Sequence, residues 1–162
     1  MFVLKIVGTA CITGATTLYA RGLVNELSCR IAALKAIKQS FTTLKGELRY
    51  GVETLPSAFM HVGERCSCGQ ETVRDFFWNT GNRLKTENGS ILKEVWEEEA
   101  KKLAAAACLN GNECDNLIAV ADSLGYLDLT QQTNNIELYL QSVDESIEAL
   151  SGKYEQNSRM YM

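Results

Sequence analysis

Proline is almost absent from this 162-residue sequence, and its scarcity narrows the choice of fold. The single proline is Pro56. Because proline interrupts helices and central strands and gathers in loops, a chain nearly free of it favours long helices joined by short turns. No segment alternates apolar and polar residues in the manner of a half-buried strand. With 46% hydrophobic residues, which is ordinary for a globular protein, we expect a folded all-α chain.

Residues and motifs that catalysis commonly uses are also scarce. His61 is the single histidine, so any triad or dyad that needs an imidazole would depend on it alone. The sequence contains no glycine-rich phosphate loop, no nucleophile elbow and no His-Glu-x-x-His motif. We therefore predict that the protein is not an enzyme and that it binds no cofactor.

The six cysteines form neither an obvious disulfide framework nor a zinc pattern. Four lie within helical patterns among apolar neighbours, where free cysteine behaves as a small hydrophobe: Cys11, Cys29, Cys108 and Cys114. We therefore expect reduced thiols in an intracellular protein. Cys66-Ser67-Cys68, with His61 nearby, lacks the paired spacing and the fourth ligand of a structural zinc site. We predict no metal site, and the alternative is a metal- or redox-responsive membrane protein that uses Cys66 and Cys68.

Charge is distributed unevenly along the chain. Residues 1–50 carry seven Lys and Arg against two Glu, a balance of +5, whereas residues 51–162 carry nine against eighteen acidic residues, a balance of −9. A nucleic-acid-binding protein needs a basic face on its folded body. A basic stem followed by an acidic body therefore argues against a nucleic-acid partner.

The N-terminal segment is the most apolar part of the chain. Residues 2–20 are apolar or weakly polar except for Lys5, and Arg21 closes the run. A helix of this length spans about 28 Å, close to the hydrocarbon thickness of a bilayer, so we predict a transmembrane anchor over residues 1–21. A cleaved signal peptide, a lipoprotein box ending at Cys11 and a buried core helix are the alternatives. Basic residues after the run favour a cytoplasmic location for the following domain, a helical bundle over residues 22–162.

Apolar residues recur every three or four positions along the rest of the chain, as on the buried faces of helices. The stripe over residues 23–50 continues the anchor into one rod. Shorter helices are predicted after a hydroxyl cap at Thr54, around 73–84, around 92–107 with an end at Asn110-Gly111, and around 114–124. A capping box of Asp128 and Gln131 begins the last helix.

The last helix carries a regular apolar seam from Ile136 to Tyr154 that is typical of a coiled coil. We expect this seam to pack antiparallel against residues 23–50, which gives a six-helix bundle with two long antiparallel helices. A homo-oligomer built on the same seam is the alternative.

An acidic cluster marks the helix around residues 92–107. It consists of Glu94, Glu97, Glu98 and Glu99. Three consecutive residues cannot all face the core, and Val95, Trp96 and Leu103 claim the inner side. We predict that these glutamates form an electrostatic docking surface for a partner, and a plain solvated helix face is the alternative. Trp78 and Trp96 are both predicted to lie in the core.

Short motifs along the chain resemble those of one family. Glu47-Leu48-Arg49-Tyr50-Gly51, followed by Leu55-Pro56-Ser57-Ala58-Phe59, is similar to the Glu-x-x-Tyr-Gly turn and Leu-Pro-x-Ala-like helix start of the stage III sporulation protein AB family. Trp96 in an acidic helix, Leu124-Gly125 with Asp128 and Gln131-Gln132, and Arg159-Met160-Tyr161 follow in the family's order. Glu53-Thr54 replaces the usual Thr-Pro, and the Cys66–Cys68 loop is not part of the pattern. That family continues into a second transmembrane helix, where this sequence stops at Met162.

The resemblance implies a protein of the mother-cell membrane facing the forespore, similar to the cytoplasmic domains of type II secretion inner-membrane platform proteins. It implies a non-enzymatic assembly component of a secretion-like channel between mother cell and forespore. The implied partners are a secretion-type ATPase of the same operon and other membrane proteins of the channel. Tyr50, Gly51, Leu55 and Pro56 provide a second candidate partner surface. A generic membrane-tethered coiled-coil scaffold is the remaining alternative.

Overall fold

The structure, a computed structural model, describes the backbone of residues 2–50, 54–66, 69–87, 91–125 and 128–161. Side chains are described for the same residues except 2–21, 23, 24 and 157–161. These parts of the chain contain six helices and no strand, which confirms the all-α prediction. The helices are α1 (Phe2–Tyr50), α2 (Leu55–Glu64), α3 (Glu71–Thr86), α4 (Leu92–Ala106), α5 (Gly111–Leu124) and α6 (Leu129–Tyr161).

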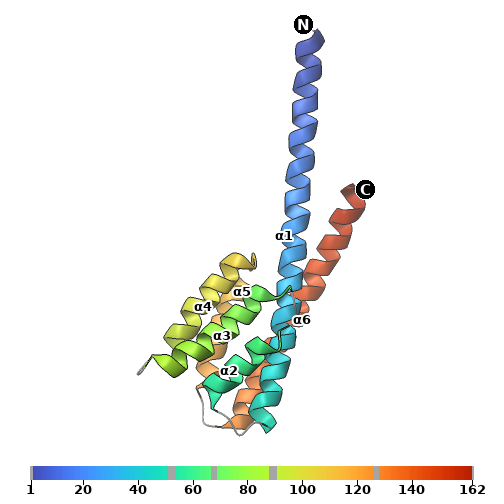
Figure 1. Cartoon of the computed structure of the whole chain (residues 1–162). Helices are drawn as coiled ribbons and strands as arrows, with labels where there is room; N and C mark the ends of the chain where they lie inside the picture. Colours follow the sequence, from blue (N-terminus) through green and yellow to red (C-terminus); the bar gives the residue numbers. More distant parts are fainter. Residues whose placement is uncertain (1, 51–53, 67–68, 88–90, 126–127, 162) are drawn as a thin grey trace.

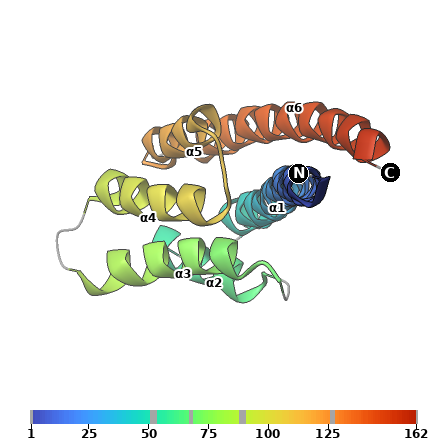
Figure 2. The ribbon, with the colours of Figure 1, turned by 90° about the horizontal axis from the view of Figure 1, so that it is seen from above.

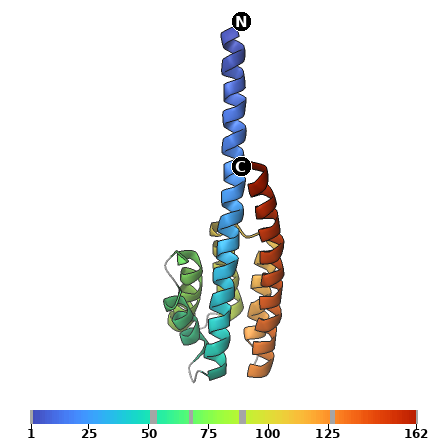
Figure 3. The same ribbon diagram turned by 90° about the vertical axis from the view of Figure 1, so that its right-hand side faces the viewer.

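The two long helices, α1 and α6, run antiparallel and side by side (Figures 1 and 3). Lys38 pairs with Asp144 at 2.6 Å and Lys45 with Glu137 at 2.8 Å. The two lysines are seven residues apart on α1, and their two acidic partners are seven residues apart on α6. Continued one residue for one, this register places Tyr161 opposite Arg21. The seam of α6 is buried or half-buried from Ile136 to Tyr154, which confirms the predicted intramolecular pairing.

The four shorter helices, α2 to α5, pack around this pair. In the view along α1, α1 and α4 lie between α2 and α3 on one side and α5 and α6 on the other (Figure 2). The N-terminal part of α1 extends beyond the bundle and beyond the end of α6 (Figure 1). The C-terminal part of α1 lies within the bundle and contributes buried residues to its core.

Trp96 is the centre of that core. Its side chain is fully buried and lies 4.8 to 6.2 Å, between ring centroids, from four phenylalanines: Phe41, Phe59, Phe76 and Phe77. Its indole N–H donates a 2.8 Å hydrogen bond to the backbone carbonyl of Leu117 on α5. The prediction for Trp96 is thus confirmed, whereas that for Trp78 is wrong because 41% of Trp78 is exposed.

Helices α2 and α3 approach closely at two glycines. A Cβ atom built on Gly81 would lie 2.6 Å from the carbonyl oxygen of Pro56, and one on Gly63 would lie 3.1 Å from that of Arg74. Gly63 belongs to the last turn of α2, where it is buried against α3. The close contact fixes the Leu55-Pro56 helix start against α3.

Several helix ends differ from the sequence prediction. Asn110-Gly111 begins α5 instead of ending the preceding helix, because Asn110 and Glu113 form a reciprocal capping box. α4 ends earlier, at Ala106. Thr54 is the N-cap of α2 but its hydroxyl makes no cap hydrogen bond and lies 3.3 Å from the Ser57 hydroxyl.

Asp128 caps α6 through the N–H of Thr130, at 2.9 Å. The sequence predicted a capping box between Asp128 and Gln131. Asp128 is confirmed as the cap, but the N–H that it accepts from is that of Thr130, one residue before Gln131.

No helix within the described part of the chain is long and apolar enough to cross a membrane. The transmembrane anchor predicted over residues 1–21 is therefore not found there. Residue 1 and the side chains of residues 2–21 lie outside the described part, so the anchor stays a prediction.

Candidate partner surfaces

The predicted acidic surface lies along α4, whose inner face holds Trp96 and its neighbours. Glu94 and Glu98 are exposed and Glu97 is half-exposed, while only 3% of Glu99 is exposed. The structure therefore brings three of the four glutamates to the surface. Glu99 lies at the edge of the core, where it pairs with Arg83 and Lys102.

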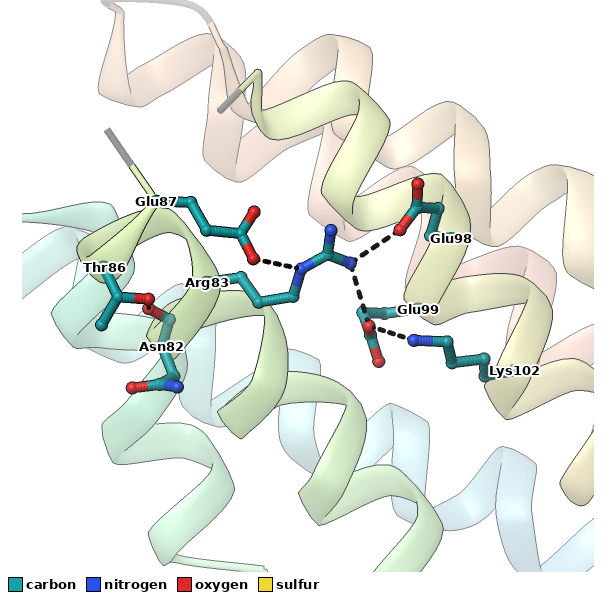
Figure 4. A network of polar contacts seen from close by, with 7 residues as sticks. All are labelled: Asn82, Arg83, Thr86, Glu87, Glu98, Glu99 and Lys102. Carbon is teal, nitrogen blue, oxygen red and sulfur yellow. Dashed lines mark hydrogen bonds and ion pairs between the residues drawn. The ribbon is translucent and has the colours of Figure 1, made fainter. Parts of the chain in front are cut away.

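Arg83 on α3 joins the two helices through an ion-pair network (Figure 4). Its guanidinium donates to Glu87 at 3.1 Å, to Glu98 at 2.8 Å and to the buried Glu99 at 3.2 Å. Lys102 adds a 2.7 Å ion pair to Glu99. Sequence reasoning missed Arg83, because nothing in its local pattern shows that it faces α4 across a helix pair.

These cations neutralise part of the acidic face. Glu97 pairs with Lys101 at 2.7 Å and Glu98 with Arg83, whereas no ion pair joins Glu94 among the described residues. The hydrogen bond and charge of Arg83 hold the pKa of Glu98 below its ordinary value. The hydrogen bond and charge of Glu97 likewise raise the pKa of Lys101. Both surface groups therefore remain charged at neutral pH, and a partner would meet a patterned surface of both signs.

The second predicted surface lies where α1 ends. Tyr50 is 80% exposed, and the guanidinium of Arg49 lies 5.7 Å from its ring centroid. Leu55 and Pro56 are half-buried in the first turn of α2, and Gly51 lies outside the described residues. Glu47 of the matched motif accepts a 2.8 Å hydrogen bond from Arg65 at the end of α2. Glu47 of the motif thus joins the last turn of α1 to the end of α2, and Tyr50 stays accessible.

Exposed apolar residues on α6 were missed by sequence reasoning. Leu129, 53% exposed, begins α6 at the same end of the helix pair as Tyr50. Leu138, 62% exposed, lies beside an open groove of about 400 Å³ between α5 and α6, which Asn116, Asp122 and Asn135 also line. A period of 3.5 residues identifies the buried seam of a helix, but it does not show how exposed the leucines outside that seam are.

The cysteines occupy different environments from those expected. Cys66 is half-buried, and its sulfur lies 3.3 Å from the Ser40 hydroxyl on α1; Cys68 lies outside the described residues. Among the described residues, no group of three or more His, Cys, Asp or Glu side chains is placed to hold a metal ion. Cys29 and Cys108 are exposed, so the expectation that they behave as small core hydrophobes is wrong.

Comparisons with known proteins agree on one group. A family model described as stage III sporulation protein AB matches residues 5–162. A solved structure described as stage III sporulation protein AB (SpoIIIAB) superposes with a TM-score of 0.69 at 20% identity, covering 78% of this chain and 97% of that chain. At that identity, the structural likeness concerns the fold. The comparison with curated proteins gives no significant match.

Proposed function

The chain belongs to the stage III sporulation protein AB family, and from this premise we propose that it is a non-enzymatic, membrane-anchored assembly component. In this proposal it belongs to a secretion-like channel between mother cell and forespore and binds a secretion-type ATPase of the same operon. The observation that carries the proposal is the family match, which runs from residue 5 to residue 162 and so includes both the stem and the bundle.

The architecture supports an anchored adaptor. The paired helices α1 and α6 form a stalk, and the register of their ion pairs sets the end of α6 beside Arg21, where the apolar N-terminal run ends. An anchor over residues 1–21 would therefore place the end of α6 near the membrane surface. The exposed Tyr50 and Leu129 would then lie at the far end of the stalk, facing away from the membrane.

We place the ATPase contact on the exposed carboxylates of α4, namely Glu94, Glu97 and Glu98. Exposed charges mainly tune association rate and partner choice, and their effect falls with salt. Glu99 is excluded from this surface because it is buried and bound by Arg83 and Lys102. The contact thus uses an edge of α4 that the fold leaves open.

A charge-reversal pair tests this contact. Glu97→Lys with Glu98→Lys should weaken ATPase co-purification at least about tenfold at low salt and less at high salt. Glu145→Lys with Glu148→Lys on α6 is the matched control, since both residues are exposed and lie on another helix. Equal losses in the two variants would indicate a general charge effect. Unchanged binding in the α4 variant would move the contact elsewhere, with Tyr50→Ala as the next variant.

The location of the protein has its own test. The full chain should remain in the membrane pellet after carbonate extraction, whereas a chain beginning at Gly22 should be released. If the body is cytoplasmic, an impermeant maleimide applied to intact cells should leave the exposed Cys29 and Cys108 unlabelled until lysis. Release of the full chain by carbonate would contradict the anchor, and labelling of intact cells would contradict the orientation.

A further inference from the structure

An open groove runs between α5 and α6, and neither the α4 carboxylates nor Tyr50 is part of it. Its volume is about 400 Å³, and side chains between Asn116 and Ser123 on α5 and between Asn135 and Ser142 on α6 line it. These two helices make up the side of the bundle opposite α2 and α3 (Figure 2). The groove therefore offers a face that neither of the predicted partner surfaces uses.

The lining of the groove is partly apolar. Val120 and Tyr139 line it and are buried, whereas Leu138 lines it with 62% of the residue exposed. The lining also includes the small side chains of Ala119 and Ser142. An isolated exposed leucine is ordinary on a protein surface. A leucine in a groove, however, can be covered by one side chain of a partner, and removing its apolar surface from water favours binding.

The two helices that form the groove carry negative charge and no positive charge. Residues 103–152 include eight acidic residues and no Lys, Arg or His. Asp115 and Glu145 are exposed, and neither takes part in an ion pair among the described residues. The groove therefore lies in an acidic surface. Cations of α1 and α4 pair with four of the eight acidic residues, namely Glu113, Asp122, Glu137 and Asp144.

The two unpaired carboxylates lie near the same end of the groove. Asn116 and Ser142 also line a second, smaller cavity together, so the α5 and α6 walls meet at these two residues. Asp115 directly precedes Asn116, and Glu145 follows Ser142 by three residues, which is about one helical turn. A basic side chain of a partner would therefore find its counter-charges at this end.

Charge and secondary structure narrow the choice of occupant. A second copy of this chain, packed across a two-fold axis, would bring two acidic surfaces together, and a nucleic acid or an anionic membrane surface would also be repelled. An added strand needs an exposed sheet edge, and the part of the chain that the structure describes contains no strand. The groove therefore favours a helix with a basic face.

The length of the groove matches two turns of such a helix. Ser142 follows Asn135 by seven residues, which span about 10 Å at a rise of about 1.5 Å per residue. An amphipathic helix places its anchoring side chains at positions i, i+3 or i+4, and i+7, which cover the same length. Its apolar side would then lie against Leu138 while its basic side approaches Asp115 and Glu145.

We propose that the groove between α5 and α6 binds a cationic amphipathic helix of a partner protein. An apolar side chain of that helix covers Leu138, and Lys or Arg side chains pair with Asp115 and Glu145. Burial of Leu138 makes the main contribution to affinity, whereas the exposed carboxylates increase the association rate and select a basic partner. Because the groove shares no residue with the proposed ATPase contact on α4, the protein can hold both partners at the same time.

The binding experiment uses the full chain and a synthetic probe. The probe is a fluorescein-labelled peptide of about 18 residues, long enough to form a helix, with leucine at positions i, i+4 and i+7 and with lysine and alanine elsewhere. Fluorescence anisotropy is recorded at a constant concentration of a neutral detergent, so that micelles give a constant background. The probe should bind with a micromolar Kd at low salt and more weakly at high salt. A probe with glutamate in place of lysine should not bind.

A substitution at Leu138 tests the apolar anchor. Leu138→Ala should weaken binding of the probe at least about fivefold, because it removes the apolar surface that the probe covers. Leu129→Ala is the matched control, since Leu129 is also an exposed leucine of α6 but does not line the groove. The control should change the Kd by less than about twofold, and circular dichroism should show that both variants fold like the wild type because both leucines are exposed.

Charge variants test the acidic end of the groove. Asp115→Asn with Glu145→Gln should weaken binding at least about threefold at low salt and have little effect at high salt. Glu64→Gln with Glu71→Gln is the matched control, because both residues are exposed and lie on α2 and α3. This control should leave binding unchanged at both salt concentrations.

The α4 carboxylates are the competing site for a cationic peptide. Glu97→Lys with Glu98→Lys should leave the Kd of the probe unchanged to within about twofold, although it should weaken the proposed ATPase contact. The two proposals can therefore fail independently. No binding of the probe at low salt, equal losses in Leu138→Ala and Leu129→Ala, or a loss confined to the α4 variant would overturn the proposal for the groove.

Discussion

Arg30 on α1 donates two hydrogen bonds, each 2.8 Å long, to the two carboxylate oxygens of Glu113 on α5. The side chain of Glu113 is 8% exposed and that of Arg30 is 19% exposed, so the pair is shielded from solvent. Glu113 also completes the capping box with Asn110. One carboxylate therefore begins α5 and at the same time fastens it to the stalk.

Replacing Arg30 by Met should destabilise the bundle by about 2 kcal/mol. Removing one partner leaves the other charge buried without its counterion, which is costly even where the intact pair adds little net stability. Glu113→Gln should cost less, about 1 kcal/mol, because glutamine can still accept the Asn110 N–H. Urea unfolding measures both changes. A cost for Arg30→Met no larger than that of an exposed control, Lys35→Met, would contradict the burial of the pair.

Gly81→Ala should destabilise the protein by about 2 kcal/mol. The added Cβ would lie 2.6 Å from the Pro56 carbonyl oxygen and 2.8 Å from the Met60 Cγ, so α2 must shift away from α3. Gly152→Ala is the control, since a Cβ there meets nothing within 4 Å, and it should stabilise α6 by about 0.5 kcal/mol through helix propensity. Equal effects of the two substitutions on the urea midpoint would show that the helices are not in this contact.

Trp96→Phe should cost about 3 kcal/mol. The substitution removes the 2.8 Å hydrogen bond to the Leu117 carbonyl and leaves a cavity among four aromatic rings. Trp78→Phe is a matched control because Trp78 is 41% exposed, and it should cost less than about 1 kcal/mol. Thermal or urea unfolding separates the two, and a similar cost for both would contradict the central position of Trp96.

The sequence predicted the helices well because their signals are local and periodic. The apolar seam of the last helix and the apolar stripe over residues 23–50 together predicted an antiparallel pair, and the Lys38–Asp144 and Lys45–Glu137 ion pairs agree with it. Arg83 and Glu99 show where this reasoning ends. Their roles depend on how α3 crosses α4, and a crossing angle is a property of the tertiary packing that no spacing within one helix records.

Some local residue preferences were also outweighed, either by a competing local signal or by the tertiary packing. Asn110-Gly111 resembles a helix end, yet the capping box to Glu113 makes it a helix start. The preceding helix ends instead at Ala106, and Cys108, two residues later, adopts the left-handed conformation that glycine usually adopts after a helix. Trp78 has helical spacing with buried neighbours and its backbone lies against Gly63 of α2, yet 41% of the residue is exposed.

Tyr139→Phe should change how stability depends on alkaline pH. Tyr139 is 7% exposed, and burial, with smaller contributions from the charges of Glu113 and Cys114, raises the pKa of its phenol well above the ordinary value. A folded-state pKa above the unfolded one means that the stability of the protonated form is complete below the unfolded pKa, about 10, and is lost as the pH rises beyond it. At neutral pH, where the phenol is protonated in both the folded and the unfolded state, the substitution should change the free energy of unfolding by no more than about 1 kcal/mol.

The measurement is a series of urea unfolding curves from pH 8 to pH 11 for the wild type and Tyr139→Phe. Their difference should stay constant up to about pH 9.5 and then fall by about 1.4 kcal/mol per pH unit above pH 10, because only the wild-type unfolded state gains a phenolate. Lys93 and Lys101, whose pKa values are raised by Asp122 and Glu97, titrate in both proteins and cancel in the difference. Tyr50→Phe is the control, since its ring is 80% exposed, and it should leave the alkaline limb unchanged. A constant difference between the wild type and Tyr139→Phe up to pH 11 would mean that the phenol of Tyr139 reaches water in the folded protein.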